Sequence, residues 1–387
     1  MARAPGTMTH RKLSPPTQSR SSASSILRSV SSSTRRQERC ASSSRLHTSA
    51  VGRHSSATAV AAQYTAMVPS SHMGLRSSLA FGSPIPSEWA GGELLVDEYP
   101  PAGLSAPRNP RPKHRAPARQ EATYVKVGLS CIITPRDWTW RETFEKAQAA
   151  GYEAIELVLR DDSELDWDTP VEGLRTIRQM AGDFGLELDS LCPQTSKRID
   201  LLSPDPAVRE EGKDRCKKLL EIAKELGIDG VLVVPGAVTP EVHYDDAYSR
   251  ALEGFCDLAP FAEDIEVTLA IEYVWNKFLL SPLEWQRFLG EIGSDRVGLF
   301  FDTGNMTIFG FPEQWVKIVG QGVKKVHFKD FKRMMEWKPL LEGDVDFPAV
   351  MRELRNIGFD GACLSEVDPG LASLEDTAAA IRKILEM

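Results

Sequence analysis

The stretch "AKELGIDGVLVV", residues 223–234, joins the end of a helix to a strand through Gly227. Its first half has the residue types of a helix, and its second half is a short apolar run with β-branched residues. The glycine stands where the residue after a helix adopts a positive φ. The same order recurs in "AQAAGYEAIELVL" (147–159), "AGDFGLELDSL" (181–191) and "LRNIGFDGACLSEV" (354–367). This repetition of helix, glycine and strand predicts a parallel sheet covered by helices.

The helix before Gly227 has a clear apolar stripe. It is predicted to begin near Asp205 and Pro206, a capping residue followed by proline at the first helical position. Its apolar positions recur at helical spacing and are Cys216, Leu219, Leu220, Ala223 and Leu226. One face of this helix is therefore expected to pack against the sheet.

Eight strands can be counted in the second part of the chain. They are predicted at about 125–134, 153–159, 187–193, 229–235, 267–274, 297–302, 324–329 and 361–367. Eight strand–helix units in roughly 265 residues are typical of an α/β fold of the (β/α)8 TIM barrel type, placed here at residues 123–387. A doubly wound sheet is the alternative, but no glycine-rich phosphate-binding motif follows the first strand.

The first part of the chain has a different composition. Residues 1–122 hold 16 Lys and Arg against 6 Asp and Glu, a net charge of +10, whereas the remainder holds 30 against 48, a net charge of −18. Residues 1–80 are rich in Ser and Arg, which predicts a disordered transit peptide, and residues 81–122 have the Pro-rich composition of an extended linker. Because "SRLHTSA" (44–50) resembles a mitochondrial cleavage region, we expect import into the mitochondrion rather than the plastid. A leader without a targeting signal would leave the protein in the cytoplasm.

Composition also bears on partners. No uninterrupted apolar stretch reaches the roughly 18 residues of a membrane span, so we expect a soluble protein with no membrane partner. The basic leader lacks interleaved aromatic residues and the body is acidic, which argues against a nucleic-acid partner. The sequence leaves a homo-oligomer open.

Four predicted strands end in polar residues that a core strand avoids, namely Glu272, Asp302, His327 and Glu366. Any one of them alone is more often a paired or solvated group. Burying all four at one end of a barrel without a cation would cost several kcal/mol each, because like charges repel in a low dielectric. Three carboxylates and one imidazole form a mostly oxygen site that suits Mn2+, Mg2+ or Co2+, with Zn2+ as a further candidate. We therefore expect a divalent metal ion, with Mn2+ favoured.

Five runs carry a family resemblance by their order and spacing. They are "IEYVWNKFLLSP" (271–282), "FFDTGNMTIFG" (300–310), "KVHFKDFK" (325–332), "LLEGDVDFPAVMRELRNIGFDG" (340–361) and "LSEV" (364–367). Over residues 124–387 the chain resembles the sugar phosphate isomerase/epimerase family of xylose-isomerase-like barrels. The runs are most similar to the L-ribulose-5-phosphate 3-epimerase and hexulose-6-phosphate isomerase branch, and less so to the D-tagatose 3-epimerase branch.

The resemblance implies roles for individual residues. It implies a metal site on Glu272, Asp302, His327 and Glu366, in which the two glutamates also transfer protons. It further matches Glu156, at the end of the second strand, with a glutamate that binds a substrate hydroxyl. An acid exposed at a strand end is the alternative interpretation of Glu156.

Four more residues are candidate substrate-binding groups. Asn305 stands where the D-tagatose 3-epimerase branch has a substrate-binding histidine, and its amide is expected to bond a sugar hydroxyl. Lys277, Lys329 and Arg333 are expected to bind a hydroxyl or a phosphate group. Each of these three bases, considered alone, is more commonly a surface charge.

The expected function is that of an isomerase, a metal-dependent C3 epimerase of a ketose or ketose phosphate. One glutamate removes a proton, an enediolate forms, and the other glutamate returns a proton from the opposite face. An aldose–ketose isomerase shares this intermediate, and a polyol dehydratase or lyase would use the same metal chemistry. An abasic-site endonuclease is disfavoured because the predicted barrel holds only His243 and His327. A non-catalytic sugar-binding barrel is disfavoured because all four ligand positions are filled.

Overall fold

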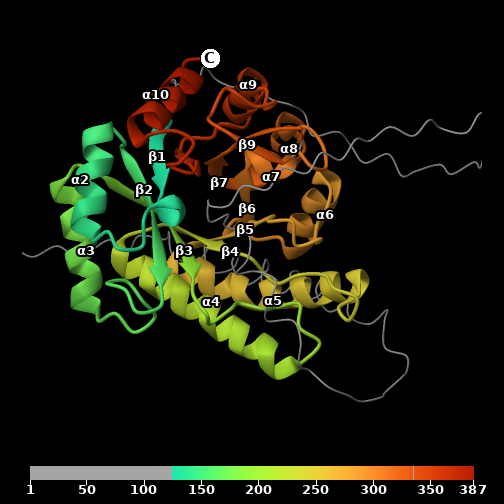
Figure 1. Ribbon diagram of the computed structural model, residues 1–387. Coiled ribbons are helices and arrows are strands. Elements are labelled where there is room, and N and C mark those ends of the chain that lie inside the picture. Colours follow the sequence, from blue (N-terminus) through green and yellow to red (C-terminus); the bar gives the residue numbers. More distant parts are fainter. Residues whose placement is uncertain (1–123, 334) are drawn as a thin grey trace, which may run out of the picture. The chain divides into compact units, whose positions relative to one another are not determined.

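The structure is a computed structural model that describes residues 124–333 and 335–387 (Figure 1). The predicted leader (1–80) and linker (81–122), together with the targeting prediction, lie outside the described residues. The first described residue, Tyr124, stands where the predicted barrel begins.

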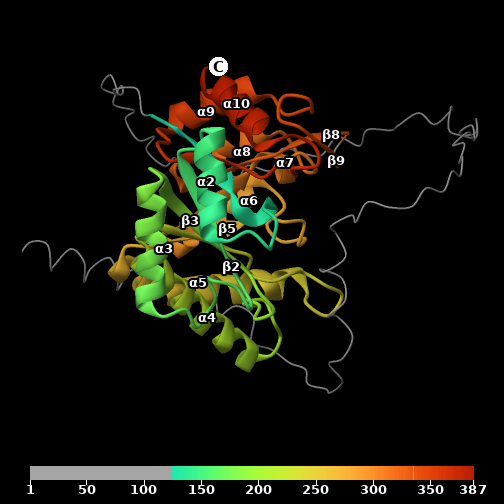
Figure 2. The same ribbon diagram turned by 60° about the vertical axis from the view of Figure 1, so that its left-hand side comes forward.

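Eight parallel strands close into a barrel, in the order β1-β10-β7-β6-β5-β4-β3-β2. The strands are β1 (Lys126–Ser130), β2 (Ala154–Arg160), β3 (Glu187–Gln194), β4 (Gly230–Val233), β5 (Thr268–Glu272), β6 (Val297–Asp302), β7 (Val323–Phe328) and β10 (Ala362–Ser365). Figures 1 and 2 show helices surrounding the strands. The (β/α)8 prediction is confirmed, and the open doubly wound sheet is excluded because β1 pairs with both β10 and β2.

The helices follow the strands in the chain as the repeat predicts. They are α2 (Trp140–Ala150), α3 (Val171–Asp183), α4 (Pro206–Leu226), α5 (Tyr244–Ile265), α6 (Pro282–Ile292), α7 (Thr303–Met306), α8 (Pro312–Val319), α9 (Phe347–Ile357) and α10 (Leu374–Leu385), with 3-10 turns at η2 (Cys131–Ile133) and η3 (Gly320–Gly322). None of the described helices combines the length and apolar character that crossing a bilayer requires.

The ends of α4 lie where the sequence predicts them. Its N-cap is Asp205, whose side chain accepts a hydrogen bond from the backbone N–H of Ala207 at 2.9 Å. Pro206 fills the first helical position, where its missing N–H costs nothing. The helix stops before Gly227, whose φ of 77° is unfavourable for a side chain.

The first strand is shorter than predicted. The apolar run suggests a strand over about 125–134, but β1 ends at Ser130 and the 3-10 turn η2 follows. Ser130 caps this turn, because its hydroxyl accepts from the backbone N–H of Ile132 at 3.4 Å. A local side-chain bond therefore turns an apolar segment that hydropathy alone assigns to a strand.

The interior of the barrel is filled below its C-terminal mouth. One buried cluster consists of Ala154, Cys192, Leu232, Ala270, Phe300, Ala362 and Leu364. Ala270, Phe300 and Leu364 each precede a predicted ligand by two residues, and alternate residues of a strand share one face. The ring of Phe300 lies 4.3 Å from that of His327, measured between centroids. The predicted ligands therefore rest on an apolar layer.

A charged group fills the barrel nearer the N-terminal ends of the strands. The ammonium of Lys325 lies 3.1 Å from Asp189 Oδ2 and 2.7 Å from Asp229 Oδ1. Burial lowers the pKa of Lys325, but the two carboxylates outweigh it and leave that pKa raised. Lys325 is therefore a charged residue of the barrel interior, paired within it.

A small hairpin follows β7 and was not predicted. It consists of β8 (Asp330–Lys332) and β9 (Glu336–Lys338), with Phe331 opposite Trp337. Asp330 fixes its base by accepting hydrogen bonds from the backbone N–H groups of Gly343 at 2.9 Å and Val345 at 3.2 Å. A Cβ atom at Gly343 would lie 2.0 Å from Asp330 Oδ1, so only glycine fits there. The hairpin lies beside α7 at the mouth of the barrel (Figure 2).

Candidate active site

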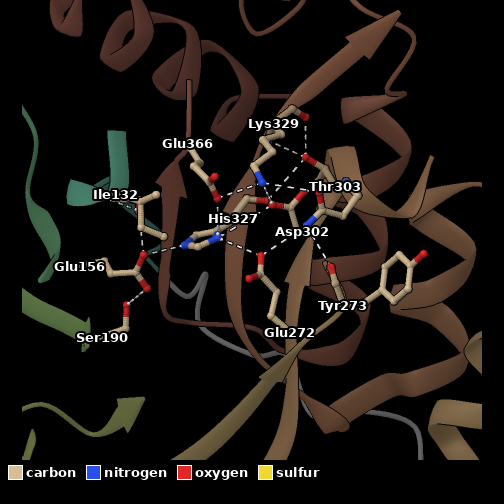
Figure 3. A network of polar contacts seen from close by, with 12 residues as sticks. Ile132, Glu156, Ser190, Glu272, Tyr273, Asp302, Thr303, His327, Lys329 and Glu366 are labelled. Atoms are coloured by element: carbon tan, nitrogen blue, oxygen red, sulfur yellow. Dashed lines mark hydrogen bonds and ion pairs between the residues drawn. The ribbon is translucent and has the colours of Figure 1, made fainter. Parts of the chain in front are cut away.

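The four predicted ligands come together at the C-terminal mouth of the barrel. Glu272 ends β5, Asp302 ends β6, His327 lies in β7 and Glu366 directly follows β10. One potential ligand atom from each lies within 4.8 Å of the others. Asp302 and His327 are register partners on neighbouring strands, which places them at one level. Figure 3 shows the four side chains pointing toward one another.

The imidazole of His327 lies at the centre of this group. Its Nδ1 atom is 3.2 Å from Glu366 Oε2, 3.4 Å from Glu272 Oε1 and 3.9 Å from Asp302 Oδ2. The side chains of His327 and Asp302 are fully buried, and those of Glu272 and Glu366 are nearly so. The site is therefore a compact cluster of three carboxylates around one ring nitrogen.

Glu156 approaches the same imidazole from the other side. Its Oε1 atom lies 2.9 Å from His327 Nε2 and also accepts from the Ser130 hydroxyl at 2.7 Å. Its Oε2 atom accepts from the Ser190 hydroxyl at 2.8 Å, and the side chain is fully buried. A carboxylate at this distance favours the tautomer that carries its hydrogen on Nε2, which leaves the Nδ1 lone pair facing the three acids.

Lys329 lies on the opposite side of the cluster. Its ammonium is 2.9 Å from Asp302 Oδ2 and 3.0 Å from Glu366 Oε2. Figure 3 marks both contacts by dashed lines. The hydroxyl of Thr303 fixes the backbone of this residue, because it accepts from Lys329 N–H at 2.9 Å and donates to Lys329 C=O at 2.7 Å. The lysine is therefore held against two of the predicted ligands.

Asn305 is buried beside Asp302 and Glu272. Its backbone N–H donates to Asp302 Oδ1 at 2.8 Å, so the carboxylate also caps the short helix α7. Its side-chain amide donates to the backbone carbonyl of Tyr273 at 2.9 Å and approaches Glu272 Oε1 at 3.4 Å. The structure thus brings Asn305 to the site, where its amide orients one of the predicted ligands.

The other two predicted substrate-binding residues are exposed. Lys277 lies on the loop after β5, and Arg333 lies at the turn of the β8–β9 hairpin. The backbone N–H of Arg333 donates to Asp344 at 2.8 Å. Within the described part of the chain, no ion pair or side-chain hydrogen bond joins either residue to the cluster. The substrate-binding roles of these residues, and of Glu156, Asn305 and Lys329, stay predictions.

The family is identified by a model described as "Xylose isomerase-like TIM barrel", which matches residues 144–384. The chain belongs to the xylose isomerase-like TIM barrel family. Among curated relatives, L-ribulose-5-phosphate 3-epimerase UlaE of Shigella flexneri serotype 5b (strain 8401) is 27% identical over 269 residues, which cover 67% of this chain and 92% of that protein. The family resemblance predicted from the sequence runs is therefore confirmed.

Solved structures show the same fold. L-ribulose 3-epimerase is 19% identical with a TM-score of 0.58, and the match covers 68% of this chain and 95% of that one. D-psicose 3-epimerase, solved in the presence of D-fructose, is 21% identical with a TM-score of 0.57, covering 68% of this chain and all of the other. The barrel described here therefore has the same fold as these two 3-epimerases.

The charged groups of the cluster give its two glutamates different pKa values. Burial raises the pKa of Glu272 to about 7, although His327 and Lys329 oppose it. Burial would also raise the pKa of Glu366, but Lys329 and His327 outweigh it and hold that pKa at about 2. Burial opposes protonation of His327, yet the Glu156 charge and the surrounding carboxylates raise its pKa well above the usual value. Without a bound cation, the cluster therefore favours the protonated form of the His327 imidazole.

The donor set of the cluster fits a divalent metal ion. His327 Nδ1 and Asp302 Oδ2 are buried, and the charged groups nearest to them are Glu366 at 3.2 Å and the Lys329 ammonium at 2.9 Å respectively. With the imidazole neutral and the acids Glu272, Asp302 and Glu366 ionised, three negative charges face the single ammonium of Lys329, which leaves a net charge of −2 for a divalent cation to neutralise. Because a metal binds neutral imidazole, it would replace the proton that the metal-free cluster favours on His327.

Sequence reasoning missed the groups that support these ligands. Ser130 and Ser190 both donate to Glu156, and Thr303 fixes the backbone of Lys329. One signal was available for the serines, since Ser130 and Ser190 both lie within predicted strands, where apolar residues are the rule. The hydroxyl of Thr303 had no such signal, because it follows a candidate ligand at the start of a helix where threonine is common.

Proposed function

We propose that the protein is a divalent-metal-dependent epimerase that inverts C3 of a ketose or ketose phosphate. One observation carries the proposal: three carboxylates and the Nδ1 atom of one imidazole converge at the mouth of the barrel. Membership of a family whose named relatives here are 3-epimerases supports the isomerase class. Glu272, Asp302, Glu366 and His327 Nδ1 would hold the metal ion, with Mn2+ the favoured ion.

A bound divalent cation would polarise the ketose carbonyl and lower the barrier to ionising the neighbouring C–H bond. The residues of this chain supply the proton transfers. Glu272 and Glu366 end strands three steps apart around the ring, so they reach the substrate from different sides. One glutamate, ionised, takes the C3 proton, and the other, protonated, gives its proton to the opposite face of the planar enediolate, which inverts the carbon. Proton exchange with solvent then restores both glutamates to their starting states.

The surrounding residues orient these groups. Glu156 holds the imidazole of His327 in one tautomer, and Lys329 holds one oxygen of both Asp302 and Glu366. Asn305 orients Glu272 through its amide. Such positioning matters because proton transfer requires heavy atoms within about 2.6–3.2 Å.

The test is a panel of ketoses and ketose phosphates incubated with the protein and Mn2+, with the products separated by chromatography. An epimeric ketose is expected, and chelation should abolish its formation while far-ultraviolet dichroism stays unchanged, because a large barrel core does not depend on one cation. An aldose product would instead support the aldose–ketose isomerase, and loss of water would support the dehydratase. Turnover that survives exhaustive chelation would show that no metal is required.

A further inference from the structure

The β8–β9 hairpin places an indole ring next to the candidate ligands. The ammonium of Lys329 lies 5.4 Å from the ring centroid of Trp337, within the range of a cation–π contact. The same ammonium lies 2.9 Å from Asp302 and 3.0 Å from Glu366. A single side chain therefore separates Trp337 from two of the groups that would hold the metal ion.

The indole is supported by a buried aromatic ring. Trp337 meets Phe331 edge to face, with 4.8 Å between centroids and an angle of 80° between planes. Phe331 is fully buried, and its ring centroid lies 5.9 Å from that of the half-buried Trp275 on the loop after β5. Phe331 therefore positions Trp337 directly, and Trp275 in turn packs against Phe331.

Trp337 nevertheless keeps a large accessible surface. Its side chain is 38% exposed, although Phe331, its partner across the hairpin, is fully buried. An indole that is oriented by its neighbours and still open on one side is suited to contact a ligand, because the binding pockets of small molecules are commonly lined by aromatic rings with a few polar groups.

Lys329 is poorly placed to bind substrate itself. Its ammonium is surrounded by Asp302, Glu366, the side-chain oxygen of Asn305 at 3.5 Å and the indole ring. A phosphate would have to displace one of these carboxylates. The accessible group on this side of the cluster is the indole rather than the amine.

We propose that Trp337 is a substrate-binding residue whose exposed indole forms one wall of the sugar pocket. The C–H groups of a ketose carry partial positive charge, and the face of an indole is electron-rich, so the two pack favourably. The proposal rests on the proposed function, because the contact would hold a sugar over the candidate ligands. In this arrangement the indole of Trp337 contacts the apolar side of the carbohydrate. The metal site recognises the oxygen atoms of the sugar.

The test compares Trp337→Ala and Trp337→Phe with the unmodified full chain. Tyr124→Ala serves as a matched control, since Tyr124 is an exposed aromatic residue that precedes β1 at the opposite end of the barrel. The Mn2+-loaded proteins are titrated with D-fructose, D-psicose and L-ribulose while tryptophan fluorescence is recorded. Mn2+ affinity is measured separately by calorimetry, and steady-state kinetics give KM and kcat.

Trp337→Ala is expected to raise the sugar Kd and KM about tenfold, the effect of losing a contact of roughly 1.4 kcal/mol. Trp337→Phe should recover most of the affinity, because it keeps an aromatic face. The Mn2+ Kd should be unchanged in both variants, and kcat should change far less than KM. The fluorescence change on sugar binding should be lost in both, since neither retains this indole.

The two proposals fail in different ways. If the unmodified protein converts a ketose and Trp337→Ala leaves both KM and sugar Kd unchanged, the indole is not part of the pocket. If no sugar is converted but sugar binding still depends on Trp337, the pocket assignment stands and the proposed reaction is wrong. If sugar neither binds nor reacts, both proposals are refuted. A fall in Mn2+ affinity equal to the fall in sugar affinity would show that the hairpin supports the ligands instead.

Discussion

The most discriminating prediction concerns Glu156, for which sequence and structure suggest different roles. The resemblance implies that it binds a substrate hydroxyl, whereas the structure shows both of its oxygens bonded to buried protein groups. Replacing Glu156 by Ala would leave His327 Nε2 and the hydroxyls of Ser130 and Ser190 without this partner. The imidazole would then no longer be held in the tautomer that directs Nδ1 to the acids.

The size of the effect follows from this loss. Removing the carboxylate partner of a ligating histidine typically weakens metal binding by about 10–100-fold. That factor corresponds to about 1.4–2.7 kcal/mol of binding free energy. Each buried polar group left unpaired also costs about 1–3 kcal/mol of folding stability, so the melting temperature should fall.

Calorimetric titration with Mn2+ measures the first effect, and thermal unfolding followed by dichroism measures the second. Glu156→Gln is the matched control, because its amide oxygen can still accept from Nε2–H and should keep most of the affinity. Ser190→Ala removes one partner of Glu156 without reaching His327 and should change Mn2+ affinity little. If folded Glu156→Ala binds Mn2+ as tightly as the unmodified protein and only its KM rises, the orienting role is refuted and the substrate-binding role is supported.

Three further outcomes are expected. Glu272→Gln and Glu366→Gln should each lower turnover by about 10²–10⁴-fold, the usual value of general acid–base catalysis. Product formed in D2O by the unmodified enzyme should carry deuterium at C3. Near-normal rates in both variants would refute the two-glutamate mechanism. A chain starting at Glu121 should fold cooperatively and stay active, and residues 1–80 fused to a fluorescent protein should reach the mitochondrion; a cytosolic signal would contradict the targeting prediction. Glu142 has its pKa lowered by hydrogen bonds to Thr139, so its charged form stabilises the fold above pH 4.5 and loses that effect as pH falls through the lowered pKa. Glu142→Gln should therefore lower the melting temperature at pH 7 but not in acid, and an equal difference at both pH values would contradict this linkage.

Much of the barrel could be predicted because its elements are determined locally. The sixth strand, predicted at 297–302, matches β6 (Val297–Asp302), since an apolar run there ends at a capping aspartate. The convergence of the four ligands could also be predicted, because parallel strands of a closed barrel present their C-terminal ends at one mouth. The clustering of Glu272 with Glu366 follows from closure rather than from any proximity in sequence.

The supporting contacts could not be predicted, because they depend on which side chains closure brings together. Lysine is commonly a surface residue, yet Lys325 is buried and pairs with Asp189 in β3 and with the exposed Asp229 that directly precedes β4. The β8–β9 hairpin has strands of only three residues, too short for a periodic signal. Trp337 therefore had no sequence feature that separated it from any other exposed aromatic residue.

The apolar layer beneath the ligands has a consequence for the isotopic content of unconverted substrate recovered from D2O. Phe300 and Leu364 are fully buried below the acids, and Lys325 fills the interior further down, so water can reach Glu272 and Glu366 only from the mouth. A sugar bound at the mouth would close that route while the proton is being transferred. The glutamate that removes the proton can then return it to the original face before it mixes with the solvent, which regenerates unlabelled substrate, whereas the opposite glutamate supplies the deuterium of the product. Unconverted substrate recovered from D2O should consequently carry less deuterium than the product, and widening the mouth with Trp337→Ala should raise the deuterium content of that substrate.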